Sequence, residues 1–294
     1  MRRGFTLIEV LVALALLALL VGFGLRSLVS GVQANNGLSA SLSAEQKARR
    51  ILQVFTQDLR SAAFGALSPT PYPTGRHSIS FLLVDAAGGN VVLPHDSGRN
   101  ASFRRADEFK YVPRNRVLAV RTGEEGLLVN ATGEALLFVA TQAGFVGGGR
   151  AKVTHSGCAN AIDYTPNTLL FKVIRLGYRY DPKNATLYRN WGRGEAPVAY
   201  GVRRFDLDYV YVSSADNRIR TNLGSYDYDR PTGAPPTEVQ LDGRTYRLKR
   251  LTLTLAVDAV SRNAKKTRTL SATVDLLRGT PQTIRTVYVC GGKP

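Results

Sequence analysis

The sequence has 294 residues, which is enough for one large domain or two small ones. Hydrophobic residues make up 44% of it, a content that permits a packed core and excludes disorder of the low-hydrophobicity kind. The formal net charge of +17 favours anionic partners such as nucleic acid, acidic cell-surface polymers or lipid headgroups, although an arginine-rich genome or simple solubility is the blander explanation.

An apolar run covers residues 5–25, directly after Arg2, Arg3 and Gly4. As an α-helix it would be about 31 Å long, enough to cross the hydrocarbon core of a bilayer. The arginines before the run place its start in the cytoplasm, so we expect the rest of the chain to lie outside the inner membrane. An ordinary signal peptide cleaved after Ala34, a plain membrane anchor and a buried core helix are the alternative interpretations.

Glu9 separates these interpretations, because it places a carboxylate inside the apolar run. Such a group costs about 2.5–3.5 kcal/mol on insertion scales, and neither a signal peptide nor a plain anchor has a use for it. An acidic side chain within a membrane span is by default a functional group whose partner must be identified. The sequence therefore predicts a specific role for Glu9.

The segment GFTLIEV (residues 4–10) resembles the processing and methylation motif of type IV prepilins. The resemblance implies that a prepilin peptidase cuts after Gly4, that residues 1–4 are a leader, and that the new terminal Phe5 is N-methylated. It also implies that Glu9 pairs with the terminal ammonium of a neighbouring pilin in a filament. That ammonium has an ordinary pKa of about 8, and a carboxylate offsets the cost of burying it.

The helix is expected to continue well beyond the apolar run. Apolar residues recur between Ala48 and Ala66 at the i, i+3, i+4, i+7 spacing of an amphipathic helix. We therefore predict one helix over residues 5–66, hydrophobic all round in its first half and packed on a globular domain in its second. Four interior glycines between residues 22 and 37 are weak points, each costing roughly 1 kcal/mol relative to alanine. A proline-rich stretch at residues 69–73 stops the helix.

A β-rich region follows. After Pro73 the helical period gives way to short β-branched and aromatic runs separated by turn residues. The sequence predicts an α+β protein in which the long N-terminal helix packs on a large antiparallel β domain over residues 67–294. Residues 213–240 are expected to form a long loop or disordered insert. Strands are expected over residues 78–84, 116–121, 135–141, 151–155, 168–180, 186–191, 205–213, 246–260, 267–277 and 283–290.

Four segments resemble PilW-type minor pilins and J-type minor pseudopilins, and they occur in the same order. The first is RRILQVFTQDLRSAAFG at residues 49–65, in the second half of the helix. The others are the hairpin YRYDPKNATLYR at 178–189 and the strands VAYGVRRFDLDYVYV at 198–212 and RLTLTLAVDAV at 250–260. The resemblance leaves residues 74–165 largely unplaced.

The two cysteines, Cys158 and Cys290, are far apart and do not form a C-x-x-C motif. In an exported protein we expect one disulfide, which closes a loop of about 130 residues and contributes about 4–5 kcal/mol in the chain-entropy model; two buried thiols are the alternative. His155 and Cys158 have the spacing of half a zinc site, but no second half follows. We expect no metal, no cofactor and no enzymatic activity, because neither a nucleophile elbow nor a P-loop occurs.

Basic residues gather in two stretches, at residues 99–121 and 244–268, and the first is interleaved with aromatic residues. Phosphate contacts together with base stacking would suit DNA, whereas an ordinary solvated surface is the alternative. Arg104, Arg105, Lys265 and Lys266 are the candidate DNA or anion contacts.

The resemblance implies a minor type IV pilin that primes pilus assembly or forms the pilus tip together with other pilins. It would be a single-pass inner-membrane protein before assembly and part of an extracellular or periplasmic filament afterwards. A J-type pseudopilin of type II secretion and a DNA-binding pilus module for natural transformation (competence) are the alternatives.

Overall fold

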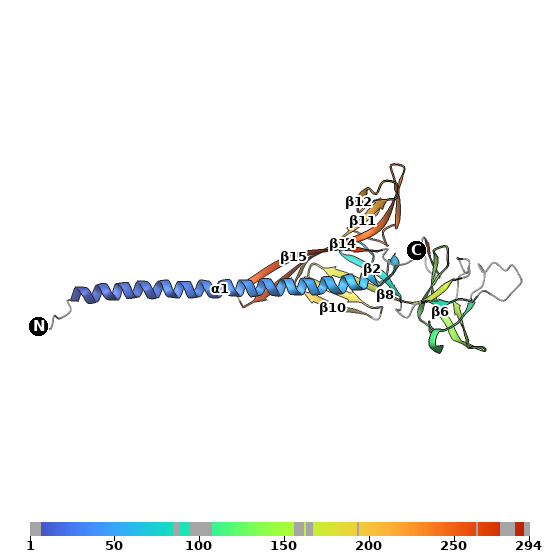
Figure 1. Cartoon of the computed structure of the whole chain (residues 1–294), viewed down its shortest axis with the longest axis horizontal. Coiled ribbons are helices and arrows are strands. Elements are labelled where there is room, and N and C mark those ends of the chain that lie inside the picture. Colours follow the sequence, from blue (N-terminus) through green and yellow to red (C-terminus); the bar gives the residue numbers. More distant parts are fainter. Residues whose placement is uncertain are drawn as a thin grey trace.

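The computed structural model describes residues 7–84, 89–93, 108–155, 162, 167–192, 194–262, 264–276 and 286–290. One long helix, α1 (Leu7–Arg60), is followed by two β-sheets, so the predicted α+β class is confirmed. Figure 1 shows that the first half of α1 projects as a rod away from the sheets, whereas its second half lies along them. The helix is continuous across the glycines between residues 22 and 37.

The C-terminal end of α1 differs from the prediction. The helix ends at Arg60 rather than at residue 66, and β1 (Ala62–Leu67) follows directly. β1 pairs antiparallel with β2 (Ser78–Val84), with Ala62 opposite Leu83. A run of small apolar residues is compatible with either a helix or a strand. Here the segment forms a strand, because the edge of β2 offers it backbone hydrogen bonds. The predicted helix over residues 5–66 is therefore wrong in its last turn and a half.

The smaller sheet has five strands in the described part of the chain, in the order β12-β11-β14-β13. β15 pairs with β14 on the same side as β13, so the β14–β15 hairpin forms one edge of the sheet. The strands are β11 (Val202–Ser213), β12 (Ile219–Thr221), β13 (Glu238–Leu241), β14 (Arg244–Ser261) and β15 (Ala264–Asp275).

The larger sheet has eleven strands among the described residues, along the path β1-β2-β8-β5-β6-β7-β4 with β3, β9, β10 and β16 attached. Its pairings are antiparallel except that of β16 with β6, which is parallel. β8 links the two ends of the sheet, because it pairs with β5 near its start and with β2 and β9 further along. The remaining strands are β3 (Asn90–Val91), β4 (Glu108–Tyr111), β5 (Glu125–Val129), β6 (Glu134–Val146), β7 (Arg150–His155), β8 (Leu169–Asp181), β9 (Thr186–Asn190), β10 (Glu195–Tyr200) and β16 (Thr286–Val289).

Two hydrophobic cores define two lobes. In the proximal lobe, the second half of α1 packs on β2, β8 and the smaller sheet, and the Phe55 ring lies 5.2 Å from Tyr178 and 5.8 Å from Phe205. In the distal lobe, built on β4–β7, Phe109 and Phe138 pack edge to face at 5.5 Å. Figure 1 shows the distal lobe beyond the C-terminal end of α1. Residues 74–165, which the sequence leaves unplaced, supply most of this lobe.

Most predicted strands are confirmed with ends shifted by a few residues, but two expectations are wrong. Residues 116–121 are not a strand. Arg116, with a φ of 55°, ends the short 3₁₀ turn Arg114–Arg116, and residues 117–121 have no strand assigned. The predicted loop over residues 213–240 contains β12 and the start of β13. The sequence also missed β3, β4 and β5, which are short, and the strand expected at residues 198–212 is divided at Gly201 between the end of β10 and β11.

Candidate functional site on the N-terminal helix

The first half of α1 presents apolar side chains to its surroundings on every face. Each large hydrophobic side chain described between Leu7 and Val32 is more than half exposed, with Leu7 at 81% and Leu20 at 70%. By length and composition the helix is able to cross a membrane. Such a surface is far larger than the apolar patches that soluble monomers expose, so it requires lipid or other helices to cover it.

The residues of the processing motif lie at the start of this segment. Gly4 and Phe5 fall outside the described residues, and Glu9 lies within the first turns of α1, although its side chain is not among those described. A carboxylate at this position is favoured by the positive end of the helix dipole. Cleavage after Gly4, methylation of Phe5 and pairing of Glu9 with an ammonium stay predictions.

The second half of α1 is fixed to the proximal lobe by small side chains. Ala40, Ala44 and Ala48 are fully buried at intervals of four residues, which lets the helix backbone approach β14 and β15 closely. Beside them, Arg268 Nε donates a hydrogen bond to Ser41 Oγ at 2.8 Å. Further along, Phe55 and Leu59 continue the buried stripe with larger side chains. The helix therefore changes from a fully exposed to a half-buried element near residue 40.

Asp58 joins the end of α1 to the β8–β9 hairpin. Its carboxylate accepts hydrogen bonds from the Tyr178 hydroxyl and from Arg189 Nη2. The side chains of Arg189 and Asp58 are only 15% and 14% exposed, and the Arg189 guanidinium lies 3.7 Å from the centroid of the Trp191 ring. Burial, reinforced by the Asp58 charge, raises the pKa of Tyr178 far above its ordinary value. In the sequence, Asp58 stands out only as part of the resemblance at residues 49–65. The sequence does not reveal the hydrogen-bond partners of its carboxylate, of which Tyr178 lies 120 residues further along the chain.

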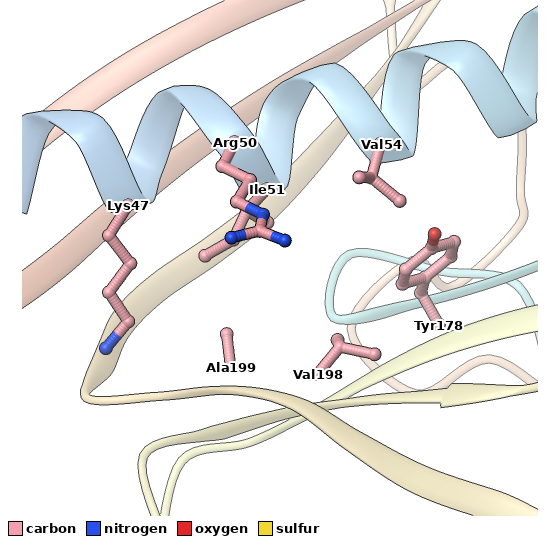
Figure 2. Close-up of a pocket in the computed structure, with 7 residues that line it drawn as sticks. All are labelled: Lys47, Arg50, Ile51, Val54, Tyr178, Val198 and Ala199. Carbon is pink, nitrogen blue, oxygen red and sulfur yellow. The ribbon is translucent and has the colours of Figure 1, made fainter.

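A cleft separates α1 from β10 next to this cluster (Figure 2). Its volume is about 380 Å³, and its walls are mostly apolar with two cationic side chains on the helix. Lys47 Nζ also donates a hydrogen bond to the Tyr200 carbonyl oxygen. In the described part of the chain, no three histidine, cysteine or acidic side chains gather as a metal site would require. The lining residues are Lys47, Arg50, Ile51, Val54, Tyr178, Val198 and Ala199.

Cys290 and His155, two of the residues considered for a disulfide or a metal site, lie close together in the distal lobe. Cys158 lies outside the described residues, and Cys290 follows β16 with its Sγ 3.6 Å from Nδ1 of His155. His155 is fully buried and its ring lies 5.2 Å from that of Phe138, so it belongs to the distal core. The disulfide between Cys158 and Cys290 stays a prediction.

The basic stretch at residues 244–268 does not form one patch, because the long β14–β15 hairpin separates its two ends. At one end Arg247 and Arg250 pair with Glu238 at 3.0 Å and Asp275 at 2.9 Å. At the other end Lys265 and Lys266 lie at the start of β15, beside α1. Arg104 and Arg105 lie outside the described residues.

A family profile described as the prokaryotic N-terminal methylation motif matches residues 1–25. Over 62 residues the chain is 39% identical to Pilin-like protein PilA3 of Thermus thermophilus. This similarity covers 21% of the chain and 27% of PilA3, so the chain spans about a quarter of the length of the curated relative it matches. No solved structure matches the chain. With the methylation motif leading into an exposed apolar helix, the N-terminal part of the chain is that of a type IV pilin-like protein, and it passes into a β-rich domain.

Proposed function

We propose that this protein is a minor pilin, cut after Gly4, methylated at Phe5 and assembled into a type IV pilus through α1. The observation that carries the proposal is the apolar surface of α1, exposed from Leu7 to Val32 behind the methylation motif. In a filament the same segments of neighbouring subunits cover one another. Glu9 then matches the ammonium of a neighbour's Phe5 and sets the axial register between the two helices.

The position of the distal lobe supports a place at the filament tip. The lobe extends past the C-terminal end of α1, roughly along the helix axis (Figure 1). Within a filament of parallel helices, the space beyond one head is occupied by the head of the next subunit. At the tip this space is open, so a subunit with such a lobe fits best as the first one assembled. This is the position of a minor pilin that primes assembly.

The similarity to Pilin-like protein PilA3 favours a pilus over a type II secretion filament. Mass spectrometry of the mature chain tests the processing step. The proposal expects a terminal methylated Phe5, whereas a terminus at Asn35 would show cleavage by an ordinary signal peptidase and overturn it.

Replacing Glu9 tests the assembly step. A Glu9→Gln chain should be processed normally, but its amount in sheared pili should fall about tenfold or more, because the neighbour's ammonium is left unmatched in an apolar core. Glu45→Gln is the matched control, because Glu45 lies on the same helix and forms an i, i+4 ion pair with Arg49 at the surface. Normal recovery of the Glu9→Gln chain in pili would refute the proposal.

A further inference from the structure

The tip of the β14–β15 hairpin lies beside α1 where the exposed apolar segment ends. The hairpin runs along the helix and is the part of the β region that reaches furthest towards the N-terminus (Figure 1). Lys266 packs on Gly37, with its Cε 3.7 Å from the position that a Cβ of Gly37 would occupy. Gly37 follows Val32 by five residues, which is about 7.5 Å along a helix.

This tip is strongly cationic. Arg262, Lys265, Lys266 and Arg268 are all exposed, and Arg203 of the neighbouring strand is 52% exposed. Asp258 is a buried acidic group beside them; it is 7% exposed and pairs with Arg203 at 2.5 Å and Lys265 at 2.9 Å. One buried carboxylate thus offsets one charge among five.

The adjacent helix compensates for little of the remaining charge. It has no acidic residue between Glu9 and Glu45, and Glu45, which lies within electrostatic reach of Arg268, is already paired with Arg49. The tip also carries an apolar side chain, Val260, which is 66% exposed. Cations surrounding an exposed aliphatic side chain are suited to the interface between water and lipid, where the apolar group enters and the cations meet the headgroups.

We propose that the β14–β15 hairpin tip, through Arg262, Lys265 and Lys266, binds anionic phospholipid headgroups of the membrane that α1 spans. The inference rests on the proposed membrane insertion of α1. With Leu7–Val32 in the bilayer, the tip lies within about a Debye length, some 8 Å, of the headgroups, where lysine and arginine are attracted to anionic lipid. DNA at the same cations would have to enter the narrow space between the β domain and the bilayer.

The contact holds the subunit in a defined orientation at the membrane before assembly. A head held at the membrane keeps α1 at a fixed depth and orientation, and the contact is lost when the subunit moves from lipid into a filament. Extraction should therefore become easier as the proportion of anionic lipid falls.

The test uses the full chain with Val260→Cys labelled by a fluorescent dye and reconstituted into phosphatidylcholine vesicles that contain a headgroup-spin-labelled lipid. Parallel vesicles replace part of the phosphatidylcholine with phosphatidylglycerol. We expect the spin label to quench the dye several-fold more strongly with phosphatidylglycerol present, and high salt to reverse this. The unsubstituted chain, treated with dye in the same way, measures labelling elsewhere.

A chain with Arg262→Gln, Lys265→Gln and Lys266→Gln should show the weak quenching of neutral vesicles in both lipids. The matched control, Arg218→Gln with Arg220→Gln and Arg230→Gln, removes the same charge from exposed arginines elsewhere on the β domain and should behave as the labelled parent. Quenching that is indifferent to phosphatidylglycerol, or equal in the triple variant and the control, overturns the inference. If the dye fluorescence changes on addition of duplex DNA but not with phosphatidylglycerol, the inference is refuted and the cations bind nucleic acid instead.

Vesicle flotation separates this inference from the proposed function. If the chain does not float with neutral vesicles, α1 does not insert into the membrane, and both the proposed function and the hairpin contact are refuted. If the chain floats but the dye ignores lipid charge, only the hairpin contact is refuted.

Discussion

Two acidic residues on α1 show how burial changes the contribution of an ion pair. Glu45 pairs with Arg49 one turn away at 2.7 Å, with side chains 34% and 69% exposed. Asp58 pairs with Arg189 across the fold, and both side chains are nearly buried. The first pair is screened by water and contributes little to stability, as exposed helix pairs do. The second holds two buried polar groups, Arg189 and Tyr178, which would be left without their acceptor if the carboxylate were lost.

Asp58→Asn should therefore lower the free energy of unfolding by about 3 kcal/mol, because it leaves the Arg189 charge buried and unmatched. Urea unfolding of the detergent-solubilised chain, followed by near-ultraviolet circular dichroism, measures this. Glu45→Gln in the same assay should leave the free energy of unfolding nearly unchanged. Equal effects of the two substitutions would show that the Asp58 cluster does not fix the helix to the hairpin.

At the scale of the element, α1 serves two environments with one continuous backbone. Its first half exposes apolar side chains on all sides, which suits a surrounding of lipid or other helices. Its second half packs on strands of both sheets through a buried stripe, which begins with three alanines before it changes to Phe55 and Leu59. The alanines permit the close approach of β15, and the larger side chains fill the wider space nearer the end of the helix.

Ala44→Leu should separate α1 from β15. Ala44 is fully buried, and three extra carbon atoms there should cost about 1–3 kcal/mol through overpacking. Hydrogen exchange should then speed up in β15 and in the part of α1 that faces it. Gln46→Leu adds an apolar side chain at an exposed position two residues away and should leave exchange unchanged. Similar exchange in both variants would contradict close packing at Ala44.

At the scale of the whole molecule, the two lobes share structure and are not separate domains. β8 contributes residues to both, because Leu170 lies in the distal core and Leu176 in the proximal core. A third buried cluster joins them, in which Leu127 and Val129 of β5 meet Leu82 of β2 and Phe171 of β8. We therefore expect the lobes to unfold together.

Leu127→Ala tests this coupling. The side chain is fully buried between the lobes, and its truncation should lower stability by about 2–5 kcal/mol through lost burial and a residual cavity. Calorimetry should show one transition that moves as a whole to lower temperature. Val139→Ala, at a position that is 47% exposed on β6, should move it little. Two transitions, of which only one responds, would show that the lobes are independent.

Much of the fold was predictable, because its main signals are local in the chain. The apolar run, the stripe from Ala48 to Leu59 and the β8–β9 hairpin each depend on spacing within a few residues. The strand β1 was not predicted, because it depends on pairing with the edge of β2. The turn at Asn115 was missed, although asparagine is among the residues that most often adopt a positive φ. Of the candidate site, the sequence indicated the motif at residues 4–10 but neither the Asp58 cluster nor the division of the basic stretch.

The sequence by itself determined that this chain carries a prepilin motif, an apolar helix with one acid in it and a β-rich remainder, since hydropathy and period are properties of neighbouring residues. Only the tertiary structure decided where the charges and lobes lie. Arg247 and Lys265 are close in sequence, yet an extended hairpin separates them along its length, whereas Asp58 and Arg189 are far apart in sequence and in contact. The positions of the charges depend on strand pairing, because pairing brings segments that are distant in sequence into contact and an extended strand separates residues that are close in sequence.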